Sequence, residues 1–224
     1  LVEDDKTSKL SLLSQVANLY ETRLKNSSEA TRAYEEILSL NPENSEALSF
    51  LVEMYKKRKD WKRFVDVSQR HLNQVEGEEE RLTGLRDLAL IATDKLRDIP
   101  LSGTLWKALL EGLPGDPESL ENLTRIYELQ KEWTALDAVL KQRLESAGEG
   151  DMGGLLEHRA TVLSRNLDEP EQAVTHYEAL IELEPGNRKA QESLRKLYVA
   201  LGRWDELEAS YAKIERWSEY SRVL

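Results

Sequence analysis

Apolar residues recur along the chain at spacings of three and four residues, and this pattern itself repeats about every 72 residues. The short spacing is typical of amphipathic helices that bury one face, and the long period is typical of helical repeat proteins. Five landmarks repeat in this way: Ala17, Ala89 and Ala160; Tyr34, Trp106 and Tyr177; Pro42, Pro114 and Pro185; Tyr55, Tyr127 and Tyr198; and Trp61, Trp133 and Trp204.

Each repeating unit contains the apolar stripes of four helices. In the first unit these stripes predict helices through residues 10–20, 30–38, 48–55 and 61–72, with Asn26 and Asp60 near their starts as N-caps. Pro42 ends the second helix because the residue before a proline is disfavoured in the α region. The other two units follow the same plan, so the sequence predicts an all-α chain of about twelve helices.

Two stretches interrupt the helical pattern most clearly. Residues 113–117, Leu-Pro-Gly-Asp-Pro, are the strongest turn signal in the chain. Residues 146–154 hold four glycines, which disfavour a continuous helix, so we expect a long loop between repeats there. The predicted organisation is one array over residues 1–224, with double repeats at about 10–77, 78–150 and 151–217, and with 218–224 beginning a further or truncated helix.

These anchor residues resemble the tetratricopeptide (TPR) repeat pattern. The first-helix anchors are Leu48, Leu51 and Tyr55, with counterparts at Leu120, Leu123, Tyr127, Leu194 and Tyr198. The second-helix anchors are Ala30, Tyr34 and Pro42, with counterparts at Ala173, Tyr177 and Pro185, and Gly202 and Trp204 match the turn between the helices. The resemblance covers residues 10–216. It implies an α-solenoid of six helix-turn-helix repeats in a right-handed superhelix. The double period also resembles long TPR arrays of large bacterial proteins.

The departures from the family lie in the second halves of the units, where Phe64, Leu136 and Leu207 stand in place of alanine. The resemblance implies a non-catalytic scaffold that binds a peptide or partner helix on the concave face. The positions that face this groove in the family are Glu46, Ser49, Glu53, Glu118, Glu121, Arg125, Lys189, Glu192 and Lys196. The clamp of two lysines and two asparagines that grips a terminal carboxylate in chaperone-binding TPR domains is not present, so a basic or mixed peptide is the expected partner.

The overall charge narrows the classes of partner. Acidic residues number 42 against 31 basic ones, a net charge of −11, which disfavours direct nucleic-acid binding because such proteins neutralise phosphates with a basic surface. The basic run of residues 56–59 is interpreted as a solvated helix end. No apolar run reaches the length of a membrane span. The sequence has no cysteine and no signal-peptide pattern and does not begin with Met; we interpret it as an excised segment or processed chain, with the cytoplasm favoured.

The sequence offers little for catalysis or for cofactors. His71, His158 and His176 fall on three different predicted helices, without metal-ligand spacing. Phosphate-loop, dinucleotide and nucleophile-elbow motifs are absent, so we expect no cofactor, no metal and no enzyme activity. The repeated Trp61 and its two counterparts are predicted to be largely buried between helices, with an aromatic cage for a cation as the alternative.

Two rival functions and one further surface remain open at this stage. The chain could be a half-TPR scaffold of RNA-processing complexes, or a regulatory or substrate-delivery arm of a larger enzyme. Near the end of the chain, Trp217, Tyr220 and Val223 continue an amphipathic pattern without a following helix. Uncovered apolar stripes drive association, so these three residues are predicted to mediate packing or association.

Overall fold

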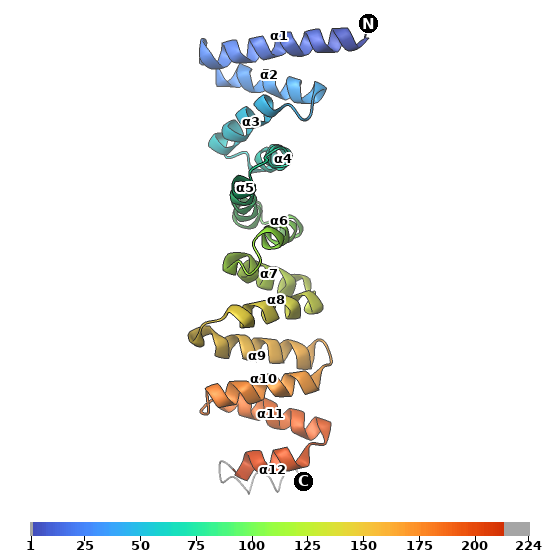
Figure 1. The fold of residues 1–224 in the computed structure, drawn as a ribbon, viewed down its shortest axis with the longest axis vertical. Helices are drawn as coiled ribbons and strands as arrows, with labels where there is room; N and C mark the ends of the chain where they lie inside the picture. Colours follow the sequence, from blue (N-terminus) through green and yellow to red (C-terminus); the bar gives the residue numbers. More distant parts are fainter. Residues whose placement is uncertain (1, 213–224) are drawn as a thin grey trace. The chain divides into compact units, whose positions relative to one another are not determined.

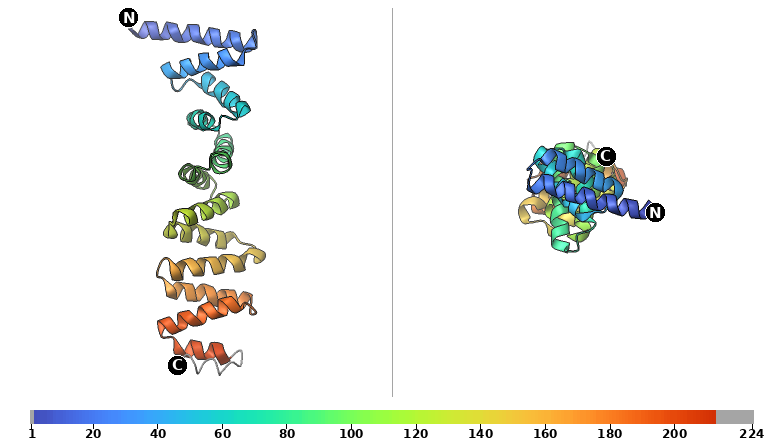
Figure 2. Two further views of the ribbon diagram at one scale, coloured as in Figure 1. Left: turned by 180° about the vertical axis from the view of Figure 1, so that it is seen from behind. Right: turned by 90° about the horizontal axis from the view of Figure 1, so that it is seen from above.

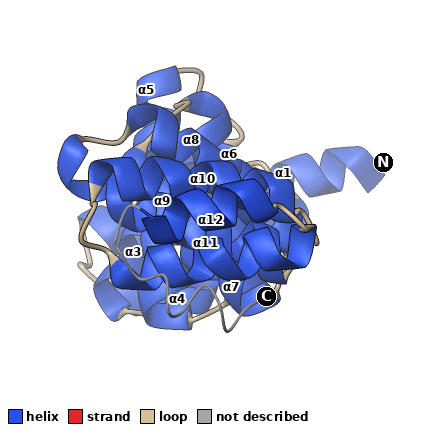
Figure 3. Cartoon of the chain, turned by 90° about the horizontal axis from the view of Figure 1, so that it is seen from below, coloured by secondary structure: helices blue, strands red, loops and turns tan. Residues whose placement is uncertain are grey.

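The computed structural model describes residues 2–212, and all regular structure in that range is helical (Figures 1 and 3). The chain divides into two compact units, Leu1–Pro114 and Gly115–Leu224. The first unit contains α1 (Val2–Thr22), α2 (Ser27–Leu40), α3 (Ser45–Arg58), α4 (Trp61–Leu72), α5 (Glu78–Ile91), the π-helical turn η1 (Ala92–Leu96) and α6 (Ile99–Gly112). The second contains α7 (Pro117–Gln130), α8 (Trp133–Ser146), α9 (Glu149–Arg165), α10 (Pro170–Leu183), α11 (Arg188–Leu201) and α12 (Trp204–Ala212).

Within each unit, every helix packs against the next one along the chain. In the second unit, for example, α8, α9 and α10 run back and forth beside one another (Figure 2). The prediction of an all-α chain built from helical hairpins is therefore confirmed for the described residues. Each hairpin buries one stripe per helix, as expected for a chain that is 40% hydrophobic and 33% charged.

Six residues in the left-handed region mark the six turns inside the hairpins. Their φ angles lie between 51° and 68°, and they follow one another at intervals of 34 and 37 or 38 residues: Lys25, Lys59, Arg97, Lys131, Asp168 and Gly202. A left-handed residue at a helix end turns the chain back on itself and satisfies the last carbonyls. The repeated backbone conformation confirms six helix-turn-helix repeats with an alternating period.

Side-chain caps begin the helices where the sequence predicts them. Asn26 accepts from the backbone N–H groups of Ser28 and Glu29, both at 3.2 Å, and Asp60 accepts from that of Arg63 at 3.4 Å. Such caps satisfy N–H groups that have no partner inside the helix.

The aromatic residue of each first half lies at the centre of the packing. Tyr34 is 1% exposed, Trp106 is fully buried and Tyr177 is 4% exposed. The buried polar atoms of these rings are satisfied, and the Nε1 of Trp106 donates to Thr93 Oγ1 at 2.9 Å. Fully buried alanines stand beside them, which lets the helix backbones approach closely.

The tryptophans of the second halves are less deeply buried than the aromatic residues of the first halves. Trp61 and Trp133 are half-buried and Trp204 is 44% exposed. Each is the first residue of its helix, so the neighbouring helices cover its ring incompletely. Trp61 makes an edge-to-face contact with Phe64, with 6.2 Å between centroids. The prediction of a largely buried ring is therefore wrong for Trp204, whereas Trp61 and Trp133 are partly buried and Trp133 packs against the core cluster of α8 and α9.

The glycine-rich stretch 146–154 is also not a long loop. Helix α8 ends at Ser146 and α9 begins at Glu149, which leaves a link of two residues. Gly153 is buried inside α9, and a Cβ at this position would overlap the Glu184 carboxylate. Glycine is thus accommodated inside the helix despite its low helix propensity.

The boundary between the two units follows the turn predicted at 113–117. Gly115 has φ of +83°, and Asp116 caps α7 with Pro117 in its first turn. The division into three double repeats over one array stays a prediction. The residues proposed for association, Trp217, Tyr220 and Val223, lie outside the described residues. None of the helices in residues 2–212 is long and apolar enough to cross a membrane.

Candidate partner-binding groove

A cavity of about 470 Å³ lies in the first unit between α1, α2 and α3. Helix α3 contributes one complete face to it, because residues spaced by three and four lie on the same side of a helix. The three residues predicted on this helix, Glu46, Ser49 and Glu53, are all exposed and all line the cavity. The full lining is Asn18, Glu21, Thr22, Tyr34, Glu46, Ser49, Phe50, Glu53, Met54 and Lys57, and we call it the α1–α3 groove.

The floor of the α1–α3 groove is aromatic. The rings of Tyr34 and Phe50 lie 4.3 Å apart between centroids, tilted by 32°. The hydroxyl of Tyr34 donates to Glu21 at 3.0 Å, and its distance to Glu46 is 3.5 Å. Burial and the hydrogen bond to Glu21 hold the pKa of Tyr34 well above its usual value, so the hydroxyl remains a donor that ties the two walls together.

The walls of the α1–α3 groove carry mostly negative charge. Glu21, Glu46 and Glu53 are exposed carboxylates, and Lys57 is the one basic residue in the lining. A second cavity of about 430 Å³ continues along α1, shares Asn18, Thr22 and Glu46 with the first, and adds the basic Arg23. A surface of this kind attracts positive charge over an apolar floor.

The equivalent face of the second unit, between α9 and α11, has a different charge. Lys189 stands at the position of Glu46 and pairs with Glu157 of α9 at 2.6 Å, and the hydrogen bond from this carboxylate raises the pKa of Lys189. Glu192 and Lys196 are exposed on the same helix. The hydroxyl of Tyr177 lies 3.2 Å from Thr161 Oγ1, where the first unit has carboxylates.

The predicted residues of α7 share one face of that helix. Glu118 is half-buried, and Glu121 forms an ion pair with Arg125 one turn further on. The structure thus groups the nine predicted residues by helix into sets of three. The first set lines the α1–α3 groove, and the third includes Lys189, which forms an ion pair with Glu157 of α9.

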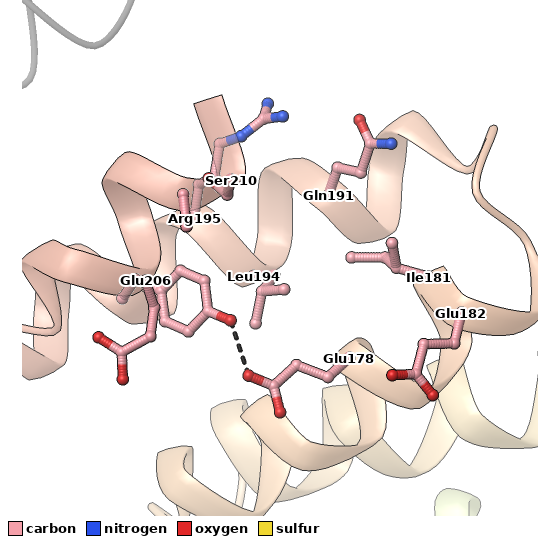
Figure 4. A pocket seen from close by; sticks show the side chains of 10 residues that line it. Glu178, Ile181, Glu182, Gln191, Leu194, Arg195, Glu206 and Ser210 are labelled. Carbon is pink, nitrogen blue, oxygen red and sulfur yellow. Dashed lines mark hydrogen bonds between the residues drawn. The ribbon is translucent and has the colours of Figure 1, made fainter. Parts of the chain in front are cut away.

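Sequence reasoning missed a polar brace on a different face of each unit. Tyr55 of α3 donates to Glu35 of α2 at 2.5 Å, and Tyr198 of α11 donates to Glu178 of α10 at 2.7 Å (Figure 4). Cavities of about 350 and 330 Å³ lie beside the two braces. The sequence contains a signal for this brace, because both the tyrosine and the glutamate recur at an interval of 143 residues. Each brace joins two helices of the chain itself, so we assign it to stability.

The histidines are separate from one another. His158 Nε2 lies 2.7 Å from a Glu128 oxygen, while burial and the nearby Arg159 lower the pKa of His176. Among residues 2–212, no group of three or more histidine, aspartate and glutamate side chains is arranged to hold a metal ion.

Comparisons with known proteins agree with this architecture. A tetratricopeptide repeat family model matches residues 119–151. A chain in the structure of Naa15/Naa10 bound to HypK-THB is 18% identical, with a TM-score of 0.55 over 98% of this chain and 34% of that chain. The pilus biogenesis factor PilW (16% identity, 96% of each chain, TM-score 0.41) and YrrB (15% identity, 79% and 87%, TM-score 0.41) also match. No curated protein matches the chain.

The described residues therefore have a tetratricopeptide-type helical-repeat fold. This fold implies a protein–protein interaction scaffold, and such scaffolds are generally non-catalytic. The chain spans about a third of the length of the matched Naa15/Naa10 chain, 34%.

Proposed function

We propose that the α1–α3 groove binds a basic, extended segment of a partner protein. The observation that carries the proposal is the placement of Glu21, Glu46 and Glu53 around a cavity of about 470 Å³ with a buried aromatic floor. Lysine and arginine side chains have apolar stems and charged heads. The stems would pack over the partly exposed Phe50 while the heads reach the carboxylates.

The preformed groove supports binding without a large ordering cost. Tyr34 is held by packing and by its hydroxyl contacts to α1 and α3, so the floor and both walls are already in place before a partner arrives. Preorganisation of this kind increases affinity because less freedom is lost on binding. A protein of the same fold, solved bound to HypK-THB, supports a protein as the class of partner.

The second unit would contribute a different preference. Lys189 and Lys196 make the exposed face of α11 more basic than that of α3, so this face would favour acidic residues. A partner that uses both units would therefore carry mixed charge. The two rival functions, the RNA-processing scaffold and the enzyme arm, remain predictions that also depend on a protein-binding surface.

The proposal is tested with short fluorescein-labelled peptides, one alternating lysine and glycine and one alternating glutamate and glycine. Fluorescence anisotropy should show preferential binding of the lysine peptide, weakening as salt is raised. The double substitution Glu46→Gln and Glu53→Gln should reduce affinity about tenfold, as expected for two charges of modest individual effect.

The matched control carries the same charge change outside the groove, with Glu79→Gln and Glu111→Gln on α5 and α6. This variant should bind the lysine peptide almost as well as the original chain. Equal losses in the two variants would show that net charge alone attracts the peptide, and the groove assignment would then be wrong.

A further inference from the structure

Basic side chains gather at one edge of the first unit, where two neighbouring hairpins turn. Residues 23–28, around the turn between α1 and α2, and residues 56–63, around the turn between α3 and α4, hold eight basic residues and one acidic residue. The two turns are in contact, because the Arg58 guanidinium donates to the Ser27 carbonyl at 3.2 Å. All eight basic side chains are exposed. A chain with a net charge of −11 therefore carries a concentrated positive surface at this edge.

The other ends of the same helices are acidic. Residues 40–46, around the link between α2 and α3, and residues 73–80, around the link between α4 and α5, hold six acidic residues and no basic residue. These two links are also in contact, since the Gln74 side chain donates to the Glu43 carbonyl at 2.7 Å. The length of the helices separates the two edges by about 20 Å. This exceeds the Debye length of about 8 Å at physiological salt, so an anion at the basic side chains interacts mainly with them.

The second unit shows that the fold does not require these charges. Its equivalent segments, residues 166–171 and 199–206, hold one basic residue and five acidic residues. The turns are nevertheless formed in the same way, with Lys25 and Lys59 in the left-handed region in the first unit and Asp168 and Gly202 in the second. The positive charge is therefore a property of the first unit and not of the helical hairpin.

The helix dipole explains only part of the cluster. The partial negative charge at a helix C-terminus favours the three basic residues in the last turn of α3. The partial positive charge at a helix N-terminus disfavours Lys62 and Arg63, which lie in the first turn of α4. The equivalent positions in α12 are Asp205 and Glu206, which this end of the helix favours. Helix-end chemistry alone therefore does not account for the basic residues of the first unit.

Some of the eight basic side chains are already used inside the chain. Lys56 pairs with Asp87 at 3.2 Å, and Arg63 pairs with Glu35 at 3.0 Å. Among residues 2–212, the other basic side chains of the two turns form no ion pair, apart from Arg58 with its bond to a carbonyl. We call these remaining five residues the basic edge: Arg23, Lys25, Lys57, Lys59 and Lys62.

We propose that the basic edge is the docking site of an acidic segment of a partner protein. The fold implies a protein–protein interaction scaffold, and the exposed ammonium groups of the edge complement aspartate and glutamate side chains. A short segment meets only the basic edge. A polynucleotide or a lipid surface fits less well, because an extended polyanion would also meet the acidic residues that make the chain negative as a whole.

The test uses a fluorescein-labelled oligoglutamate peptide. Fluorescence anisotropy should show binding that weakens as salt is raised. The triple substitution Lys25→Gln, Lys59→Gln and Lys62→Gln should weaken binding about tenfold, because it removes three charges of modest individual effect. None of these three residues lines the α1–α3 groove, so the variant keeps the groove unchanged. Unchanged affinity in the triple variant would overturn the proposal.

The matched control replaces three other exposed lysines, with Lys107→Gln, Lys131→Gln and Lys141→Gln. This variant should bind the oligoglutamate peptide almost as well as the original chain. Equal losses in the two triple variants would show that net charge alone attracts the peptide, and would overturn the proposal.

A groove variant separates this proposal from the proposed function. Glu46→Gln with Glu53→Gln should not weaken oligoglutamate binding, although the groove proposal expects it to weaken binding of the lysine peptide. Weaker oligoglutamate binding in this variant would place the acidic peptide in the α1–α3 groove and would overturn the assignment to the basic edge.

Other occupants of the basic edge are tested with the same triple lysine variant. Polythymidylate and vesicles containing phosphatidylserine should each bind more weakly than the oligoglutamate peptide. Tighter binding of either one, lost in the triple variant, would assign the edge to nucleic acid or to lipid and would overturn the proposal. Sedimentation velocity should show no self-association that depends on the edge. Self-association lost in the triple variant would identify a second copy as the occupant and would also overturn the proposal.

Discussion

The α1–α3 groove and the face between α9 and α11 are built on the same plan but carry different charges. Both place a buried tyrosine, Tyr34 or Tyr177, between the two flanking helices. The first surrounds it with carboxylates, while the second replaces Glu46 by Lys189 and uses Thr161 as the hydroxyl partner. The packing positions are the same because helix contacts depend on them, whereas exposed positions can change charge at little cost to stability.

The tyrosine–glutamate hydrogen bond on the other face of each unit also combines a repeated packing contact with exposed charges that differ. Tyr55 and Tyr198 both donate to a glutamate 20 residues earlier. The ion pair beside the brace is reversed, because Asp60 precedes Arg63 in the first unit and Arg203 precedes Glu206 at the same positions in the second. Charges at exposed positions can therefore change places while the fold remains the same.

The largest expected effect comes from the shared tyrosine. Tyr34→Ala and Tyr177→Ala should each lower the free energy of unfolding by about 3–5 kcal/mol, because each removes a buried aromatic side chain and leaves a cavity. Denaturant titration measures the loss. The control is Trp204→Ala, which should change stability by at most about 1 kcal/mol because its ring is 44% exposed. A small loss of stability at Tyr34 with a large loss at Tyr177 would show that the two tyrosines do not have equivalent roles in packing.

Exchange of the charges should transfer the binding preference. Glu46→Lys with Glu53→Lys should weaken binding of the lysine peptide about 30-fold, since each substitution changes the local charge by two units. Lys189→Glu with Lys196→Glu should strengthen binding of that peptide to the second unit. Fluorescence anisotropy measures both changes. No gain in the second pair would show that charge alone does not distinguish the two faces.

Substitutions in two equivalent turns, between α3 and α4 and between α11 and α12, should change stability in opposite directions. Lys59 has φ of 57° and Gly202 has φ of 68° at the equivalent position. Lys59→Gly should stabilise the chain by about 0.5–1 kcal/mol, because a side chain is disfavoured in the left-handed region. Gly202→Lys should destabilise it by a similar amount. Thermal unfolding distinguishes the two, and a change of the same sign in both would contradict the expectation.

The smallest expected effect is on the pH dependence of stability and comes from the hydrogen bond between Tyr55 and Glu35. It appears only at alkaline pH. Burial and the hydrogen bond to Glu35 raise the pKa of Tyr55 to about 12, from an unfolded value of about 10. A folded pKa above the unfolded one contributes stability below pH 10, which is lost as the pH rises from 10 to 12. Tyr55→Phe should make stability less dependent on pH in this window. The measurement is denaturant titration across the window, and an unchanged dependence of stability on pH in the Tyr55→Phe variant would contradict the expectation.

Much of the fold follows from the sequence alone. The 72-residue period locates the hairpins, and local chemistry locates their ends, because Asn26 and Asp60 cap helices through contacts within three residues. The buried position shared by Tyr34, Trp106 and Tyr177 is also visible as a repeat. Such features depend on neighbours along the chain or on a regular helix face, so a periodic pattern is enough to reveal them.

The tertiary structure alone decided which residues meet across helices. Glu21 lies near Glu46 only because α1 and α3 both flank Tyr34, and no local pattern pairs them. Gly153 lies buried inside a helix, beside Leu180 of α10, despite its low helix propensity. Trp204 has the same sequence pattern as Trp61 and Trp133, yet it is 44% exposed while they are partly buried. Periodicity determines which face of a helix is apolar, but burial and contact depend on what lies opposite that face.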